Sequence, residues 1–333
     1  MAPGTQVFTY FNIGKETTRG TPVAPTRQMY GTGTSMLTPD FGLNFHEGEN
    51  AGVRTTIRRA TAQSTDFRWK FTTVSGVSYD DLVWWLSQLK GGQTGAGAGA
   101  DKTWTVTGIG GSAVMNQEAY SIDIGDETQN YRLQYGMATV MKLSAALGEV
   151  TQMEAEGFAQ NAVKTAKASP AINSAPKIPG ELWTIKYAAT AAGLPGASIN
   201  LLHLVDWELE IQTGLVWRHY MDGALTGAQH VETTVSGTLS MTVESTALAV
   251  SEFYDKALAQ TFDFVRLKAT GPALGGSNYS AQIDLGILWN EPEPISSEDA
   301  GVNMYKVVGN IAYDTTATNS IAPIIVNSLA ALP

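Results

Sequence analysis

The chain has 333 residues and no cysteine, and its formal net charge is −10. The lack of cysteine excludes a disulfide framework, a thiolate metal site and a cysteine nucleophile, and the negative charge argues against a basic nucleic-acid-binding surface. Only 16% of the residues are charged, compared with about 25% in a typical soluble domain. Scarce charge favours a protein whose surface is hidden in an assembly; a low-charge, threonine-rich secreted β protein is the alternative.

The N-terminal region, residues 1–35, is rich in glycine, threonine and proline and shows little periodicity. We expect it to be an extended arm, and we expect residues 1–30, the glycine-rich loop over 91–102, or both to be mobile in a free subunit and ordered only against a neighbour. Its beginning has no basic segment followed by an apolar one, so we expect no signal peptide. No apolar run approaches the roughly 18 residues of a membrane span, so we expect a protein made and kept in a cytoplasm-like compartment.

After the arm, hydrophobic residues recur with a period of two, which is typical of strands with one buried face. Apolar and polar residues alternate over 67–71, 103–107, 120–124 and 139–147. The pattern predicts an all-β protein.

Two segments interrupt this pattern and predict helices. The first begins near Ser78, which can cap a helix, and Asp80 and Asp81 follow it at the positive end of the helix dipole. It ends before a glycine-rich loop over 91–102. The second predicted helix follows Thr246 and covers about 247–259.

The two predicted helices occur in the same order of elements, which indicates an internal repeat. Trp104 and Phe262 are 158 residues apart and Trp69 and Leu239 are 170 apart, and we match them as equivalent positions. The matched elements are a strand before the helix (67–74; 235–243), a short aromatic strand after it (104–107; 262–267), a tyrosine-led strand (120–124; 279–285) and a long alternating pair (139–158; 302–313).

The repeat sets the expected domains. We expect a first β domain over 36–160, a linker over 161–204 in which 182–187 could add a strand, and a second β domain over 205–333. Each domain would be a β-sandwich with one flanking α-helix.

The chain shows no pattern for catalysis. No nucleophile elbow or phosphate-binding loop occurs, and the glycine-rich loop follows a helix instead of a strand, so a flexible loop is the better interpretation. The four histidines lack the spacing of metal ligands: His46, His203, His219 and His230. We therefore expect no catalytic residue, no metal, no cofactor and no enzymatic activity.

Two groups of charged residues are candidates for function. Asp206, Glu208 and Glu210 fall on one face of a predicted strand because strand side chains alternate; that face is either an ordinary solvated face or the acidic wall of a channel. The second group, Arg54, Arg58 and Arg59, lies between two predicted strands. It is either a solvated hairpin or, as we favour, a contact with an acidic neighbouring subunit, which suits the planar guanidinium group.

Three stretches resemble the tail tube proteins of siphophages. The first is residues 13–26, IGKETTRGTPVAPT, where that family has a G-K-E-T segment followed by G-T and P-T. The second combines 120–125, YSIDIG, with 140–144, VMKLS, and 148–151, GEVT. The third is the tail after Ile324, which contains Asn327. The similarity is spread over most of the chain, and no single motif is diagnostic.

The resemblance implies a structural virion protein that assembles in the host cytoplasm and forms the phage tail tube. Its β-sandwich domains would form stacked rings whose inner sheets join in one large intersubunit β-barrel. Implied partners are other copies of the chain, a tape-measure protein and phage DNA in the lumen, and tail terminator and tail tip proteins, with no membrane partner. Two tube domains per chain would make a ring of three chains with pseudo-six-fold symmetry. If the second domain were unrelated to the tube domain, the ring would instead contain six chains.

Two alternatives stay open. A different phage protein from the tail, baseplate, connector or capsid surface would share the low charge and the strand pattern. A carbohydrate-binding β module or glycosidase could use some of the eight tryptophans, although Trp69, Trp104 and Trp207 fall at inward-facing positions.

Overall fold

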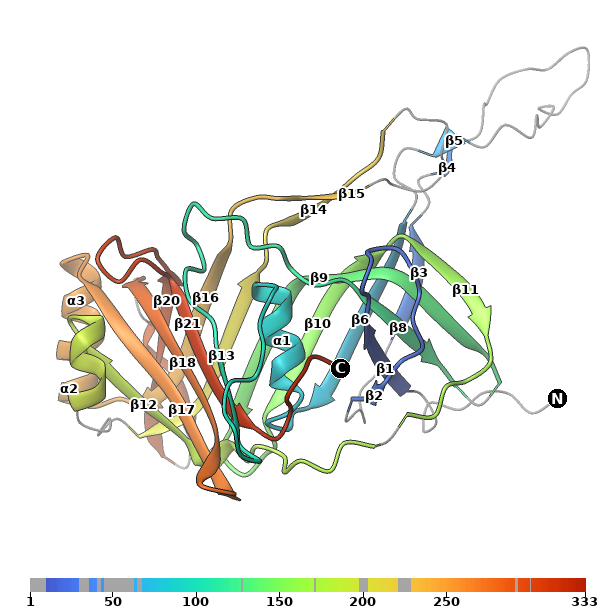
Figure 1. Ribbon diagram of the computed structural model, residues 1–333. Helices are drawn as coiled ribbons and strands as arrows, with labels where there is room; N and C mark the ends of the chain where they lie inside the picture. The colour runs from blue at the N-terminus through green and yellow to red at the C-terminus, as the bar shows by residue number, and fades with distance from the viewer. Residues whose placement is uncertain are drawn as a thin grey trace, which may run out of the picture.

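The computed structural model describes residues 10–29, 36–40, 43–44, 63–64, 68–126, 128–170, 172–197, 203–220, 229–290, 293–299 and 301–333. The protein is mostly β, with 56% strand and 10% helix, and it is built on a large antiparallel sheet (Figure 1). The predicted all-β class is confirmed at this level. Within the described residues no helix has the length and apolar character needed to cross a membrane.

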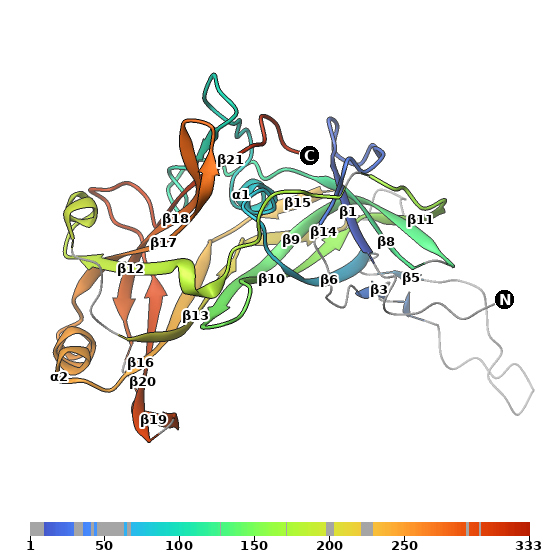
Figure 2. The ribbon, with the colours of Figure 1, turned by 90° about the horizontal axis from the view of Figure 1, so that it is seen from below.

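The centre of the fold is one antiparallel layer of eight strands, which we name the long sheet. Figure 2 shows its first and last strands far apart, at the two ends of the layer. In spatial order the strands are β3 (Met36–Asp40), β6 (Arg68–Gly76), β10 (Gln152–Ala159), β9 (Asn130–Ala146), β13 (Leu204–Gln212), β16 (Ser236–Glu244), β20 (Val302–Ile311) and β19 (Glu293–Asp299).

Two further layers pack on the long sheet. The first outer sheet contains β11 (Asn161–Thr165), the first part of β9, β8 (Tyr120–Gly125), β1 (Tyr10–Lys15) and β2 (Arg27–Gln28). The second contains β7 (Lys102–Thr105), β21 (Ile321–Asn327), β18 (Ser277–Trp289), β17 (Phe262–Leu274) and β12 (Trp183–Ala188). Small hairpins extend from the long sheet: β4 (Leu43–Asn44) with β5 (Gln63–Ser64), and β14 (Leu215–Arg218) with β15 (Gln229–Glu232).

The strand pairings of the first half of the chain recur in the second half. Each of the following pairs has a counterpart with the same order and the same antiparallel direction: β1–β8 and β12–β17; β8–β9 and β17–β18; β9–β11 and β18–β21; β9–β10 and β19–β20; β6–β10 and β16–β20; β3–β6 and β13–β16. We use the terms first set and second set for these two groups of strands.

The same offset in register recurs in both sets. On β9, a β-bulge makes the step from Ala138 to Lys142 take four residues while its partner β10 takes three, from Gly157 to Glu154. In the second set, the pairs Trp289 with Gly309 and Glu293 with Lys306 are likewise four residues apart on one side and three on the other. An extra residue bends and twists the strand that carries it, and the bulge of β9 lies where this strand passes from the first outer sheet into the long sheet.

The two sets correspond differently from the sequence-based matching. The match of 104–107 with 262–267, and of 120–124 with 279–285, is wrong: β8 corresponds to β17, and β7 instead pairs with β21 at the edge of the second outer sheet. Alternation shows that a segment is a strand but carries no information about its partner. The segment around β7 is therefore an addition to the first half without a counterpart in the second.

Two of the expected boundaries also differ. The predicted arm contains β1, which pairs with β8 and has Tyr10, Phe11 and Ile13 buried. The predicted linker 161–204 contains β12 where a strand over 182–187 was expected, and it also contains β11, which was not expected. The glycine-rich loop folds back on β7 through two backbone hydrogen bonds between Ala96 and Thr103.

Both predicted helices are present, in very different surroundings. All eight residues of α1 (Leu82–Leu89) are buried, and the helix lies between the two sets of strands (Figures 1 and 2). The second helix is broken into α2 (Ala247–Ala249), a π turn (Val250–Tyr254) and α3 (Asp255–Leu258), and it lies at the periphery. Both begin with the same contact: the Ser78 hydroxyl accepts from the Asp81 N–H at 3.3 Å, and the Thr246 hydroxyl accepts from the Ala249 N–H at 3.1 Å.

We expect β1 to contribute to stability as a core strand. Ile13→Ala removes a fully buried side chain and should lower the free energy of unfolding by about 2–5 kcal/mol. Chemical denaturation measures the change. The matched control is Ile172→Ala, whose side chain is 70% exposed, and an equally small effect of both substitutions would show that β1 is not part of the core.

Candidate functional site

The polar face of the long sheet carries the acidic residues that the sequence predicted to share one side of a strand. On β13, Trp207, Leu209 and Ile211 are buried in the core. Glu208 is exposed and Asp206 and Glu210 are half-buried on the opposite face. The alternation predicted for this strand is confirmed, because β13 is central in the long sheet and only one of its faces meets the core.

Basic residues interrupt the acidity of this face. Lys142 on β9 lies directly opposite Glu210 and forms an ion pair with it at 3.1 Å. The hydrogen bond that the Lys142 ammonium group donates to Glu210 raises the pKa of Lys142. Both side chains are partly exposed, and such surface pairs contribute only about 0–1 kcal/mol. The pair therefore affects the charge pattern more than the stability of the sheet.

The register gives the charge of this face over the seven strands other than β19. By direct cross-strand pairing, seven acidic and four basic residues of these strands lie on it, a difference of three negative charges (seven minus four): Asp40, Glu154, Glu156, Asp206, Glu208, Glu210 and Glu244, with Arg68, Lys70, Lys142 and Lys306. The face is thus moderately acidic, and its acidic residues are most concentrated at β13 and β10.

The second predicted group, Arg54, Arg58 and Arg59, lies outside the described residues. Its contact with a neighbouring subunit stays a prediction.

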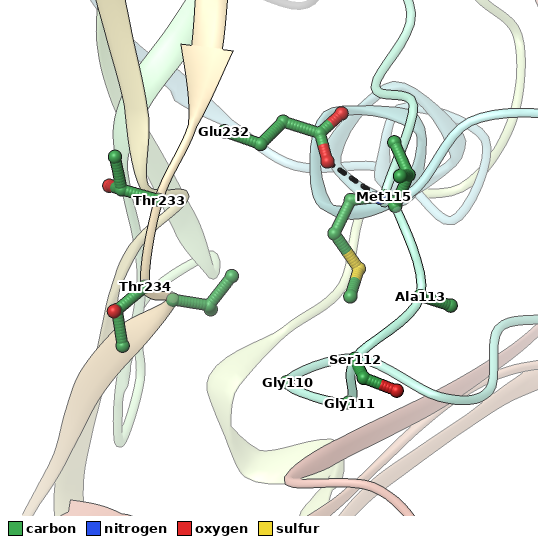
Figure 3. A pocket seen from close by; sticks show the side chains of 10 residues that line it. Gly110, Gly111, Ser112, Ala113, Met115, Glu232, Thr233 and Thr234 are labelled. Carbon is green, nitrogen blue, oxygen red and sulfur yellow. Dashed lines mark hydrogen bonds between the residues drawn. The ribbon is translucent and has the colours of Figure 1, made fainter.

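A hollow of about 480 Å³ lies between β15 and the loop at 110–115 (Figure 3). Glu232 forms one of its walls, and the carboxylate accepts hydrogen bonds from the Met115 and Asn116 N–H groups, both at 2.7 Å. Because each oxygen is already engaged with the loop, Glu232 anchors the loop to the β14–β15 hairpin. The other lining residues are small or apolar apart from hydroxyl groups, so the hollow offers no acid–base pair.

Glu16 has a structural role that the sequence did not reveal. It is buried and accepts hydrogen bonds from the Gly20 N–H at 2.6 Å, the Ser121 hydroxyl at 2.9 Å and the Tyr135 N–H at 2.9 Å. Burial raises the pKa of this carboxyl and the hydrogen bonds oppose the rise. Tyr135 has a φ of +56°, an uncommon conformation for a bulky residue, and the Glu16 contact holds it there.

The histidines that the structure describes form no metal site. His230 shares a hydrogen bond of 2.9 Å between its Nδ1 atom and the Tyr135 hydroxyl, and His203 contacts Glu244. In the described part of the chain, no group of three or more His, Asp or Glu side chains is placed to bind a metal ion.

Comparison with known proteins assigns the chain to no family. No protein-family model matches the chain, and no curated protein sequence matches it.

The anchoring role of Glu232 is testable. We expect Glu232→Ala to release the Met115 and Asn116 amides, so that their hydrogen exchange becomes faster than in the parent protein, because each loses a charge-assisted hydrogen bond. Hydrogen exchange followed by mass spectrometry or NMR measures this. Glu208→Ala on the exposed face is the control, and unchanged exchange at both amides in Glu232→Ala would refute the anchor.

Proposed function

We propose that this protein is the structural subunit of a phage tail tube. The observation that carries the proposal is the β9–β13 pairing, in which the last long-sheet strand of the first set joins the first strand of the second set edge to edge. Two equivalent four-stranded units therefore already form one continuous sheet inside a single chain. A sheet that grows by adding such units is what a tube wall requires.

The ends of the long sheet support growth beyond one chain. An open sheet leaves unpaired N–H and C=O groups at its edge strands, and pairing with another chain through such an edge is a common mode of association. A contact between two different ends of the same molecule is head-to-tail, and head-to-tail contacts close into rings when their rotation allows it. The inner sheets of neighbouring subunits would then form one large β-barrel.

The number of subunits follows from the repeat. Each chain would supply two tube domains, so a trimer would make a pseudo-six-fold ring, and rings would stack into the tube. In a phage the tube would assemble around a tape-measure protein in the host cytoplasm, end at the tail terminator and tail tip proteins, and become part of the virion.

The polar face of the long sheet suits the lumen of such a tube. Its excess of acidic residues would repel the DNA backbone, which carries about one negative charge per 1.7 Å of duplex. Contacts from lysine and arginine would instead slow the DNA. The role proposed for this surface is therefore mechanical, a non-adhesive wall for DNA ejection, and needs neither catalysis nor a cofactor.

Electron microscopy of the purified protein tests the proposal. We expect rings or tubes in negative stain at high concentration, and light scattering should show species larger than one chain. A protein that stays monomeric at high concentration, even with tail-initiating components present, would contradict the proposal. A carbohydrate-binding role would instead appear as sugar binding by the monomer.

The lumenal position of β13 has its own test. Asp206→Lys combined with Glu208→Lys changes two side chains outside the core, so stability should change by only about 0.5 kcal/mol per site. Glu210 is kept because it pairs with Lys142. We expect intact tubes that hold DNA in a salt-dependent way, measured by DNA retention at increasing salt and by ejection from assembled phage. Normal ejection from intact tails would place this face on the outside of the tube.

A further inference from the structure

We infer that the boundary between the two sets of strands is the template for the contact between subunits, so that β19 of one copy pairs with β3 of the next copy while α3 packs on β11 of that copy. The inference rests on the proposed function and adds the edges, the register and the outer contact. The occupant of each free edge is therefore a second copy of this chain.

The first support is the position of the free edges. In the corresponding order of strands, β19 is the counterpart of the second part of β9, and β3 is the counterpart of β13. Inside the chain β9 pairs with β13. Among the described residues, β3 pairs only with β6 and β19 only with β20. The two strands that lack a second neighbour are thus the counterparts of the two strands that join the sets.

The register of the contact follows from two glycines. Gly157 faces Phe71 on β6, and Gly309 faces Leu239 on β16. A Cβ atom at either glycine would lie only 2.2 Å or 2.3 Å from the nearest atom. Gly157 and Gly309 are therefore equivalent, closely packed positions. Matching these two glycines aligns the two sets of strands residue by residue.

From this alignment, the counterpart of each residue at the internal junction can be read off. Thr38 in β3 is the counterpart of Glu210, because their partners Lys70 and Thr238 occupy equivalent positions. Glu293 is the counterpart of Lys142, since each lies three steps along the partner strand from the equivalent glycine. Lys142 faces Glu210 inside the chain. Glu293 of one copy is therefore expected to face Thr38 of the next.

The second support comes from the outer layer. In the first set, α1 contacts β9 of its own set and β21 of the other set, and it is completely buried. In the second set, α3 contacts β18, the counterpart of β9. Leu258 of α3 is 66% exposed, and Val163 of β11, the counterpart of β21, is 41% exposed. One large apolar side chain is thus exposed on each of the two elements whose internal equivalents contact each other.

Repulsion between like charges favours one direction of the contact. At the internal junction the basic residue, Lys142, is on β9 and the acidic residues are on β13. The free edges differ: β19 has the acidic sequence EPISSED, while the one charged residue of β3, Asp40, forms ion pairs with Arg68 and Lys70 on the neighbouring β6. A β19 edge placed against the acidic β13 would meet like charge. Specificity of this kind depends on repulsion from the wrong partner as well as attraction to the right one.

A proline weakens the same contact. At the internal junction Thr213 N–H bonds to Thr139 O at 2.9 Å and Leu147 N–H to Val205 O at 3.1 Å, which places Ile211 among the residues that bond across it. Its counterpart in β3 is Pro39, because their partners Gly237 and Trp69 occupy equivalent positions. Proline has no N–H to donate, so the intersubunit ladder lacks a hydrogen bond that the internal ladder has. Prolines at sheet edges limit uncontrolled pairing.

Disulfide trapping tests the register, because the chain has no cysteine of its own. In the full-length protein carrying Thr38→Cys and Glu293→Cys, directly opposed residues of two copies would have Cα atoms about 4.5–5.5 Å apart, within the range of a disulfide. We expect mild oxidation of assembled protein to give covalent multimers on non-reducing gels, and reductant to remove them. The matched control is Asp40→Cys with Glu293→Cys, a diagonal pair about 7–8 Å apart, which should lose the crosslink.

The outcomes separate the inference from the proposed function. Rings or tubes in the microscope without covalent multimers would overturn the β3–β19 contact and leave the tube function standing. A disulfide within single chains would overturn it as well, because the two strands would then meet inside one molecule. Absence of any ring in the parent protein and in both variants would remove the function and the inference together. Covalent multimers from an equal mixture of the two single-cysteine proteins, stopping at dimers, would support the head-to-tail contact.

Discussion

The pairing of β9 with β13 is the interaction on which the rest of the structure depends. It runs for seven residue pairs in register and makes one sheet out of two groups of four strands. Because the sheet is continuous, its apolar face is continuous too, and buried residues from both sets form a single hydrophobic core. A chain with this core cannot separate into two independent domains, since separation would expose apolar surface on both sides of the junction.

The burial of α1 is a second consequence of that junction. The helix begins in a polar cluster where Arg27 approaches Asp80 at 3.3 Å and Asp81 at 3.4 Å, and where Asn173 donates to Asp81 at 2.9 Å. Ser328, near the end of the described chain, also contacts Asp80. Burial raises the pKa of Asp81, while Ser78 and Arg27 lower it. Segments distant in the sequence thus meet at one helix end, and removing one partner would leave a buried charge unpaired.

The sequence predicted local features well, but it predicted poorly which strands and side chains contact each other, and the reason is physical. Alternation identified the two faces of β13, and turn and capping residues placed both helices, because these depend on neighbours along the chain. The strand β1 was missed because it is short and lies in a stretch rich in glycine and threonine, and because its buried positions include Asn12, so burial on both faces leaves no alternation of apolar and polar residues. The roles of β7 and Glu16 were missed because their partners, Asn327 and Tyr135, are more than 100 residues away. Such contacts leave no local pattern.

In the proposed ring, the differences between the two sets would solve a physical problem of a repeated subunit. If both junctions were identical, free edges would pair as readily as the internal strands do, and chains could associate before the correct assembly begins. The internal junction is covalently tethered, so its strands meet at a high effective concentration and need no protection. The free edges have no tether, and there Pro39 of β3 and the acidic sequence of β19 would lower affinity while preserving direction. The same fold with different edge chemistry would then keep one junction permanent inside the chain and make the other controllable between chains.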